Sequence, residues 1–183
     1  SGGASAKGGS GQTSSAGGSC PSVEPCGGDL VGTWTVSSSC LKLSGEIEMR
    51  TFGAACKTAK VTGSFEVTGT FTAKANGGYL DNTVTTGEQQ LELEPSCLVI
   101  SSTPTDCDGA AGLLKGGLGL SKLTCTATSG GGCTCQGQVR QEGMMGIPSG
   151  LASKDGGYST AGSVLTIDGF MDYSYCVAND KLT

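Results

Sequence analysis

Apolar and polar residues alternate along one long stretch in the middle of the chain, residues 61–71. The apolar members of this pattern are Val61, Phe65, Val67 and Phe71. Because successive side chains of a strand point to opposite faces, the pattern predicts one β-strand with an apolar face and a hydroxyl-rich face. At about 3.3 Å per residue the strand would be about 36 Å long, and Gly63 and Gly69 are expected to let it bend.

Shorter alternating segments, separated by glycine-rich turns, predict about ten strands in all. We expect the others over residues 29–40, 43–49, 79–86, 89–94, 122–128, 134–141, 158–160, 163–167 and 170–177, with residues 181–183 beginning a last one. Strands and turns at this spacing favour an antiparallel barrel or sandwich. Residues 96–123 break the pattern, and Asp108 is placed to cap a short helix in a disulfide-stapled insertion.

The chain divides into a Gly/Ser-rich arm, residues 1–19, and a disulfide-rich β-domain, residues 20–183. The arm has almost no apolar side chains to bury, so we expect a flexible tether that becomes ordered only through contact. In the whole chain 33 residues are glycine and 36% are hydrophobic, which predicts a thin core that needs covalent support.

Cysteine supplies that support, because the chain has ten cysteines and no histidine. We expect five disulfides and an oxidising compartment rather than metal-bound thiolates, since no C-x-x-C pair recurs at zinc-site spacing. The expected disulfide cysteines are Cys20, Cys26, Cys40, Cys56, Cys97, Cys107, Cys125, Cys133, Cys135 and Cys176. Loop spacing favours the pairs Cys40–Cys56 and Cys97–Cys107, and either Cys133 or Cys135 could reach Cys125 across a Gly-rich turn.

A net charge of −5 and scattered lysines argue against nucleic acid as a partner. No apolar run approaches the ~20 residues needed to span a bilayer, so we expect membrane contact only through a possible upstream lipid anchor. The chain opens on Ser1 without an apolar segment, and any signal peptide is expected to have been removed.

Residues 28–36 read G-D-L-V-G-T-W-T-V, residues 76–79 N-G-G-Y and residues 173–177 Y-S-Y-C-V. With Gly32 and Trp34 forming the G-x-W of lipocalins, the chain resembles the lipocalin-like domain of cysteine-rich, Gly/Ser-tethered bacterial surface lipoproteins. The resemblance implies an antiparallel up-and-down barrel over residues 29–183, with the tryptophan closing one end. It also implies a secreted or cell-surface location outside the bacterial cytoplasm.

Candidate catalytic groups all have simpler structural explanations. Nucleophilic thiol or hydroxyl chemistry needs a base, and the chain has no histidine to act as one near neutral pH. Asp106 and Asp108 lack the repeating ligand spacing of a calcium loop, and caps and turns explain them. The glutamates lie on the polar faces of predicted strands, so we expect no enzymatic activity and no cofactor.

Two functions remain open. The first is a structural subunit of a cell-surface or extracellular assembly, a filament or ring held together by exchange of the arm, residues 1–19, which would pair with the short edge at residues 181–183. The second is a lipocalin-like carrier that binds a small apolar ligand inside the barrel. Its expected lining is Trp34, Met49, Phe65, Val67 and Phe71. A cavity of about 300 Å³ or more would favour the carrier.

Overall fold

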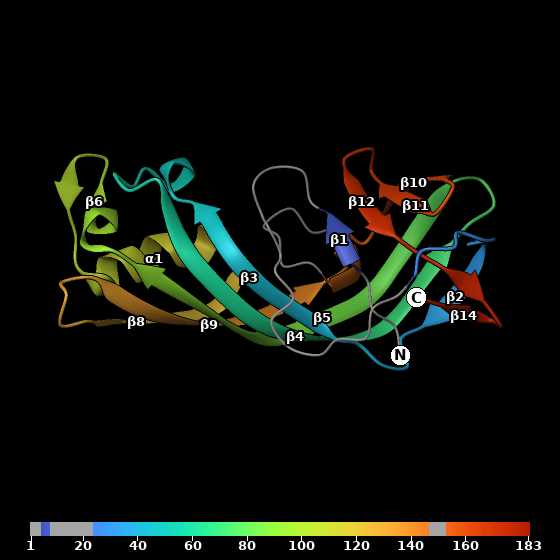
Figure 1. Cartoon of the computed structure of the whole chain (residues 1–183), viewed down its shortest axis with the longest axis horizontal. Coiled ribbons are helices and arrows are strands. Elements are labelled where there is room, and N and C mark those ends of the chain that lie inside the picture. The colour runs from blue at the N-terminus through green and yellow to red at the C-terminus, as the bar shows by residue number, and fades with distance from the viewer. Residues whose placement is uncertain (1–4, 8–23, 147–152) are drawn as a thin grey trace.

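The computed structural model describes residues 5–7, 24–146 and 153–183 of the chain, and antiparallel strands dominate it (Figure 1). Ten strands belong to one long sheet, which confirms the expected β-rich fold class. The strands are β1 (Ser5–Lys7), β2 (Gly32–Thr35), β3 (Leu41–Glu48), β4 (Thr58–Ala73), β5 (Gly78–Leu93), β6 (Val99–Ile100), β7 (Thr103–Pro104), β8 (Leu120–Ala127), β9 (Cys133–Glu142), β10 (Asp155–Ala161), β11 (Val164–Ile167), β12 (Met171–Ser174), β13 (Val177–Ala178) and β14 (Lys181–Leu182). The helices are α1 (Cys107–Gly117) and the short 3₁₀ helices η1 (Arg50–Phe52), η2 (Pro95–Leu98) and η3 (Met144–Gly146).

Strands β4 and β5 are the centre of the sheet, and each contains sixteen residues. They pair with each other over almost their whole length, with Phe65 opposite Gly87. The expected long strand over residues 61–71 is therefore confirmed and extends further at both ends. The expected break between residues 79–86 and 89–94 is wrong, because β5 continues through Gly87.

Glycines let these two strands bend and approach closely. Gly69 has a φ of 103°, and a Cβ on it would collide with the carbonyl oxygen of Asn82 on β5. A Cβ on Gly87 would collide with the carbonyl oxygen of Ser64, and Phe65 lies against the bare Gly87 backbone. An aromatic side chain that covers a strand glycine restores packing at that point, which explains why β5 is not interrupted there.

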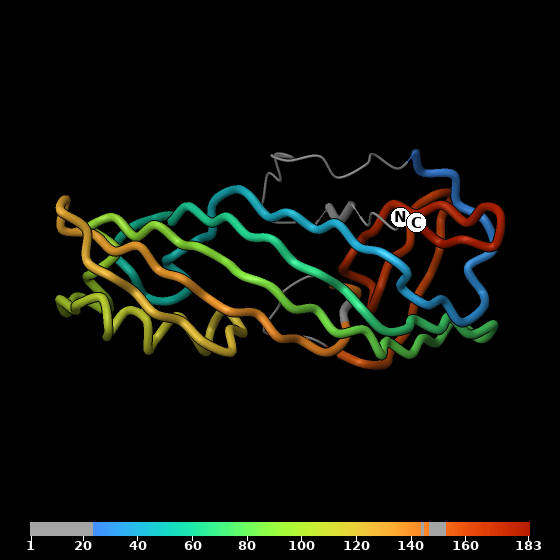
Figure 2. Tube along the Cα trace, turned by 90° about the horizontal axis from the view of Figure 1, so that it is seen from below, coloured from blue at the N-terminus to red at the C-terminus, as the bar shows by residue number. Residues whose placement is uncertain are grey.

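The sheet branches along the two long strands. At one end β3, β4, β5, β9 and β8 lie side by side, and at the other β2, β4, β5, β10, β11, β12 and β1 do. Among the described residues this second row runs from β2 to β1 without a pairing between them, so the described sheet does not close into the expected barrel. Figure 2 shows the long strands running the length of the molecule, with α1 at one end and the C-terminal strands at the other.

Helix α1 covers the inner face of the sheet at one end. We call the face with the odd-numbered residues of β4 and β5 the inner face, and the opposite one the outer face. Ala110, Ala111 and Leu114 of α1 are buried in a core shared with Val61 and Leu91 of the long strands. The N-cap lies two residues before the expected one, because Asp106 rather than Asp108 accepts a hydrogen bond from the Gly109 amide, at 2.8 Å.

A second core occupies the other end of the inner face. It contains Phe71 and Tyr79 from the long strands, whose rings stack with centroids 5.9 Å apart, together with Leu165 and Tyr173 from β11 and β12. A small cluster around Phe65 separates it from the α1 core. The outer face carries Thr, Ser and Glu that are exposed or half-buried, as the alternation predicted.

Disulfides hold both ends, and their pairing differs from the expected one. Three of them tie the α1 end: Cys56–Cys97, Cys107–Cys133 and Cys125–Cys135. The fourth, Cys26–Cys176, ties the other end, and Cys40 is also disulfide-bonded. The expected pairs Cys40–Cys56 and Cys97–Cys107 are wrong, because α1 lies across the sheet and brings Cys107 to β9 instead of η2. The reach of Cys125 across the Gly-rich turn is confirmed.

Both chain termini contribute short strands. Of the arm over residues 1–19 the structure describes only β1, which pairs antiparallel with β12 of the same chain, Ala6 opposite Tyr173. The expected edge at residues 181–183 is β14, which pairs with β13 in a small separate sheet. In the described part of the chain, no helix has the length and apolar character needed to cross a membrane.

Candidate ligand cavity

A bulge in the sheet lies beside an opening of the inner face at the end away from α1. Strands β2 and β3 both pair with β4, and between them residues 36–40 lie opposite residues 66–69. The segment that joins β2 to β3 thus has one residue more than the part of β4 opposite it, and this extra residue makes a β-bulge. Two hydrogen bonds that cross it are those from the Val36 amide to the Gly69 carbonyl, at 2.9 Å, and from the Val67 amide to the Ser39 hydroxyl, at 2.8 Å.

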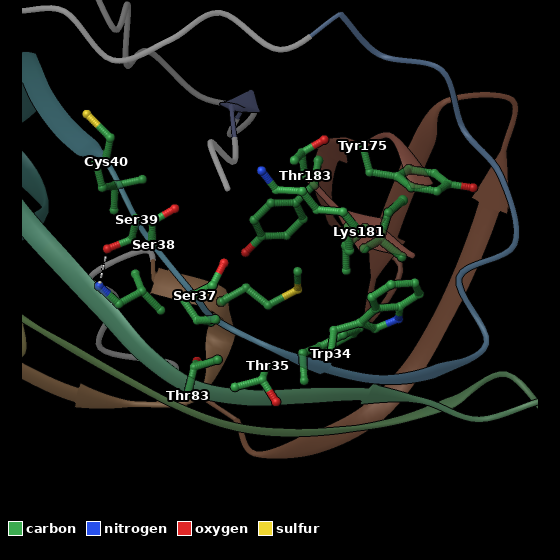
Figure 3. A pocket seen from close by; sticks show the side chains of 18 of the residues that line it. Trp34, Thr35, Ser37, Ser38, Ser39, Cys40, Thr83, Tyr175, Lys181 and Thr183 are labelled. Atoms are coloured by element: carbon green, nitrogen blue, oxygen red, sulfur yellow. Dashed lines mark hydrogen bonds between the residues drawn. The ribbon is translucent and has the colours of Figure 1, made fainter. Parts of the chain in front are cut away.

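This bulge forms one wall of a cavity of ≈ 620 Å³, which we call the Trp34 cavity. Its apolar and aromatic lining includes Trp34, Val67, Phe71, Leu165, Tyr173 and Leu182. Hydroxyl groups line it as well, from Thr35, Ser37, Ser38, Ser39, Thr83 and Thr183 (Figure 3). A space of this size with apolar walls and a few polar groups is typical of a small-molecule site.

Trp34 is half-buried at the end of the cavity beneath the C-terminal hairpin (Figure 3). Its indole nitrogen donates to the Leu30 carbonyl at 2.8 Å, so the polar atom of the ring is satisfied and the rest supplies apolar surface. Instead of closing one end of a barrel, as the resemblance implied, Trp34 is half-buried in a cavity wall.

Asp81, a fully buried carboxylate, lies behind the floor of the cavity. One of its oxygens accepts from both the amide and the hydroxyl of Thr83, at 2.9 and 2.6 Å, and the other accepts from the Met145 amide at 2.6 Å. Thr83 and Met145 themselves line the cavity. Asp81 thereby fixes η3 to β5, and so positions two of the lining residues.

Two tyrosines near Asp81 hold their protons more tightly than usual. Burial raises the pKa of Tyr79 to about 12, helped by its hydrogen bond to Asp168, whose carboxylate accepts the hydroxyl at 2.7 Å. Burial also raises the pKa of Tyr173, and the negative charge of Asp81 adds to this effect. Both hydroxyls are therefore neutral donors throughout the physiological range and cannot act as bases there.

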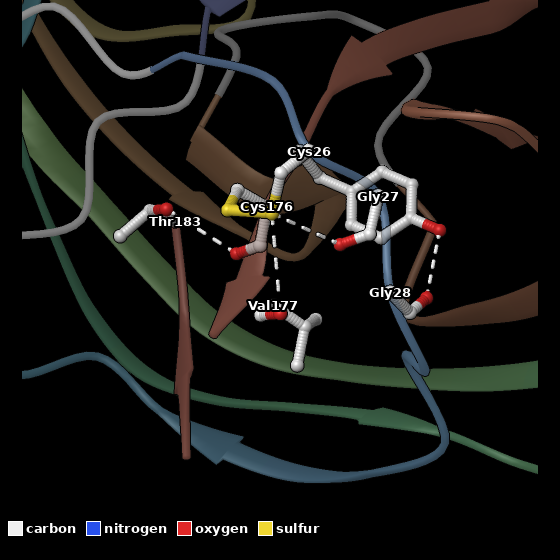
Figure 4. Close-up of a disulfide and its surroundings, with 7 residues drawn as sticks. Cys26, Gly27, Gly28, Cys176, Val177 and Thr183 are labelled. Atoms are coloured by element: carbon white, nitrogen blue, oxygen red, sulfur yellow. Dashed lines mark hydrogen bonds between the residues drawn. A yellow bond between two sulfur atoms is a disulfide. The ribbon is translucent and has the colours of Figure 1, made fainter. Parts of the chain in front are cut away.

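A C-terminal hairpin, β13 and β14, closes one side of the cavity with Lys181, Leu182 and Thr183. The Cys26–Cys176 disulfide tethers its base, as Figure 4 shows, and the Val177 amide donates to the Gly27 carbonyl at 2.7 Å. The Tyr175 hydroxyl donates to the Gly28 carbonyl at 3.0 Å. The segment that leads into β2 and the end of the chain are thus joined beside the cavity.

The structure brings together three of the five residues expected to contact a ligand. Trp34, Val67 and Phe71 line the Trp34 cavity. Phe65 instead packs with Leu120 and Val139 in the middle of the sheet, and Met49 lies in the α1 core. All share the inner face or its continuation, but the face is divided among three clusters, which periodicity along one strand does not reveal.

Sequence reasoning missed the bulge and Asp81, and it placed a strand at residues 181–183 without placing that strand beside the cavity. A signal for Asp81 exists, because Asp81, Thr83 and Thr85 are three successive polar residues among the odd positions of β5, the set that also contains Tyr79, Leu91 and Leu93. All three are buried. Polar residues on a buried face indicate a special environment, here the floor of a cavity.

Comparison with known proteins adds no relative: no protein-family profile, no curated protein and no solved structure matches the chain.

Proposed function

We propose that this chain is an exported, non-enzymatic protein that binds a small, largely apolar ligand in the Trp34 cavity. The observation that supports this most is the cavity itself, ≈ 620 Å³ between aromatic side chains and hydroxyl groups. This exceeds the volume of about 300 Å³ from which small-molecule sites begin. The proposal keeps the lipocalin-like principle of a ligand held by a strongly bent antiparallel sheet beside a tryptophan, here without a closed barrel among the described strands.

The disulfides support an oxidising location for this function. Four described disulfides and a further bonded Cys40 fit a protein that persists outside the cytoplasm. We include in the proposal a place on the bacterial surface or in the medium, as in the lipocalin-like surface lipoproteins that the G-x-W motif suggested. Neither a catalytic base nor a cofactor is part of it.

Two adjacent substitutions on β4 test the proposal. Val67 lines the cavity, whereas the next residue, Thr68, is exposed on the outer face. Titration with the neutral fluorescent probe N-phenyl-1-naphthylamine should show one saturable site per chain. We expect Val67→Phe to weaken binding about tenfold or more by filling the cavity, and Thr68→Phe to leave it unchanged. If the probe does not bind, or if both variants bind it like the wild type, the proposal fails.

A second function, assembly through the arm, is favoured by one observation. Strand β1, from the arm, pairs with the edge strand β12 in a regular antiparallel register, Ser5 opposite Ser174. In an array the same pairing could form between copies, with each arm completing the sheet of its neighbour. The structural-subunit proposal, a filament or ring, depends on that exchange.

Deleting residues 1–19 separates the two functions. For the arm-exchange proposal, light scattering should show that full-length protein forms oligomers and that the deletion leaves only monomers. Addition of a peptide with the sequence of residues 1–19 should then compete with assembly of the full-length protein. A full-length protein that is monomeric at all accessible concentrations contradicts arm exchange and leaves the ligand-binding proposal untouched.

A further inference from the structure

The Trp34 cavity has a negative charge directly behind its floor. Asp81 is 0% exposed, and both of its oxygens accept hydrogen bonds from the chain. Its donors are two amides and one hydroxyl, none of which carries a charge. Hydrogen bonds of this kind stabilise a carboxylate without neutralising it.

No cation compensates this carboxylate in the described part of the chain. The two ion pairs found there, Lys60 with Glu92 and Lys154 with Glu142, lie on the surface. The Lys154 carbonyl accepts from the Asp81 amide at 2.6 Å, while the Lys154 ammonium is paired with Glu142. Among the lining residues the charged side chains are Asp180 and Lys181, both exposed on the hairpin, and their opposite charges offset each other.

The charge lies close to where a ligand would lie. Thr83 and Met145 separate Asp81 from the cavity, and both bond directly to the carboxylate. Tyr173 of β12 also lines the cavity, and the negative charge of Asp81 helps to raise the pKa of its hydroxyl. In a buried environment of low effective dielectric such a charge is weakly screened.

Aromatic rings in the lining favour the same sign of ligand charge. Trp34, Phe71 and Tyr173 all contribute to the walls. The faces of aromatic rings attract cations, and quaternary ammonium groups are bound in this way by other aromatic sites. A buried anion behind the floor and aromatic walls around the space act together against an anionic ligand.

We propose that the Trp34 cavity binds amphiphiles whose polar group is an amine or quaternary ammonium, and that Asp81 makes it discriminate against anionic amphiphiles of the same size. This inference rests on the ligand-binding function proposed above and names its ligand class. Asp81 determines specificity without contacting the ligand: Thr83 and Met145 lie between them, and the charge acts over that distance.

Displacement of N-phenyl-1-naphthylamine from the full chain tests the inference with three ligands of equal tail length. These are octyltrimethylammonium, octanol and octyl sulfate, compared at about 0.15 M salt to screen the surface charge of the protein. A unit charge about 8 Å away at an effective dielectric constant of about 20 changes affinity by more than tenfold. We therefore expect the ammonium to bind at least about tenfold more tightly than the sulfate, with octanol between them.

Two variants that each remove one negative charge locate the effect. Asp81→Asn should bring the ammonium-to-sulfate ratio to within about threefold; a change in the position of Thr83 or Met145 alters the affinity of both ligands and largely cancels in this ratio. Glu66→Gln removes an exposed charge on the outer face of β4 and should leave the ratio unchanged. If Asp81→Asn does not fold, the wild-type measurement still decides: equal binding of ammonium and sulfate refutes the inference, and a ratio of at least about tenfold that Glu66→Gln leaves unchanged supports it.

The outcomes separate this inference from the function beneath it. If the probe and octanol do not bind, the proposed function fails and the inference with it. If they bind but the wild type takes ammonium and sulfate equally, or folded Asp81→Asn keeps the wild-type ratio, the charge selectivity of Asp81 is refuted and the ligand-binding function stands.

Discussion

The two ends of the long sheet share strands β4 and β5 but differ in what covers the inner face. At one end α1 lies on the sheet, its Ala110, Ala111 and Leu114 are buried, and three disulfides hold the connections around it. At the other end, loops and a short hairpin leave a cavity of ≈ 620 Å³. Since the same strands serve both ends, the difference comes from the covering segments. The bent sheet is covered by α1 at one end and keeps a cavity beside its second core at the other.

The Cys26–Cys176 disulfide should contribute most to stability, because it joins residues 150 positions apart. In the chain-entropy account its removal costs about 5 kcal/mol, against about 3 kcal/mol for Cys125–Cys135, which spans ten. We expect urea unfolding of Cys26→Ser with Cys176→Ser to show the larger loss. A larger loss for Cys125→Ala with Cys135→Ala would mean that the α1 end, rather than the cavity end, depends more on its covalent ties.

The contribution of α1 to stability should differ sharply between two neighbouring residues of the helix, one buried and one exposed. Leu114 is 1% exposed and Leu113 is 44% exposed. Leu114→Ala should cost about 2–5 kcal/mol of unfolding free energy, and Leu113→Ala less than about 0.5 kcal/mol. Chemical denaturation measures both. Neither change should alter probe affinity at the Trp34 cavity, and a loss of affinity in Leu114→Ala would show that the two ends are coupled.

The start of α1 offers a smaller and equally specific comparison. Asp106 accepts the Gly109 amide as the N-cap, while Asp108 lies in the first turn. Asp106→Ala should therefore cost about 1 kcal/mol, and Asp108→Ala only a few tenths through the helix dipole. Thermal unfolding of the two variants distinguishes them. The reverse order would restore the cap expected from the sequence.

At the cavity end, Tyr79 should make the free energy of unfolding depend on pH above about pH 10 but not near neutral pH. Tyr79 has a pKa raised to about 12 by burial, against about 10 in an unfolded chain. Between these values the unfolded state loses the proton and the folded state keeps it, so stability falls as pH rises from 10 to 12. Tyr79→Phe should lessen this fall, seen as unfolding midpoints compared at pH 9 and pH 11. Equal slopes in both proteins would contradict the buried, neutral hydroxyl.

Local sequence patterns predicted most of the strands but not the contacts between strands that are distant in the sequence. The alternation around Phe65 and Val67 identified β4, because period-two patterning is a property of adjacent residues. The same reasoning predicted two strands separated at Gly87, because the alternation within one strand does not reveal that Phe65 of the neighbouring strand covers this glycine. The predicted disulfide pairs were wrong for the same reason, because the pairing of Cys107 with Cys133 depends on the position of α1 on the sheet.

The candidate site was predictable only in part. Trp34, Val67 and Phe71 were found from motif and periodicity, and they do line one cavity. Met49 and Phe65 obey the same local pattern but lie in other clusters, because the bulge at residues 36–40 and the position of α1 divide the inner face. A one-residue difference in pairing, such as this bulge, depends on both strands and has no signature in either one.

Energy transfer from Trp34 to bound N-phenyl-1-naphthylamine is the most direct test of the central claim that the end of the sheet away from α1 binds a ligand. Trp34 is the single tryptophan of the chain and lines the cavity, so excitation of tryptophan should produce saturable probe emission at one probe per chain. The account predicts that this signal survives Leu113→Ala at the α1 end and is lost in Val67→Phe. Probe binding without energy transfer, or energy transfer undiminished in Val67→Phe, would place the ligand elsewhere and contradict the account.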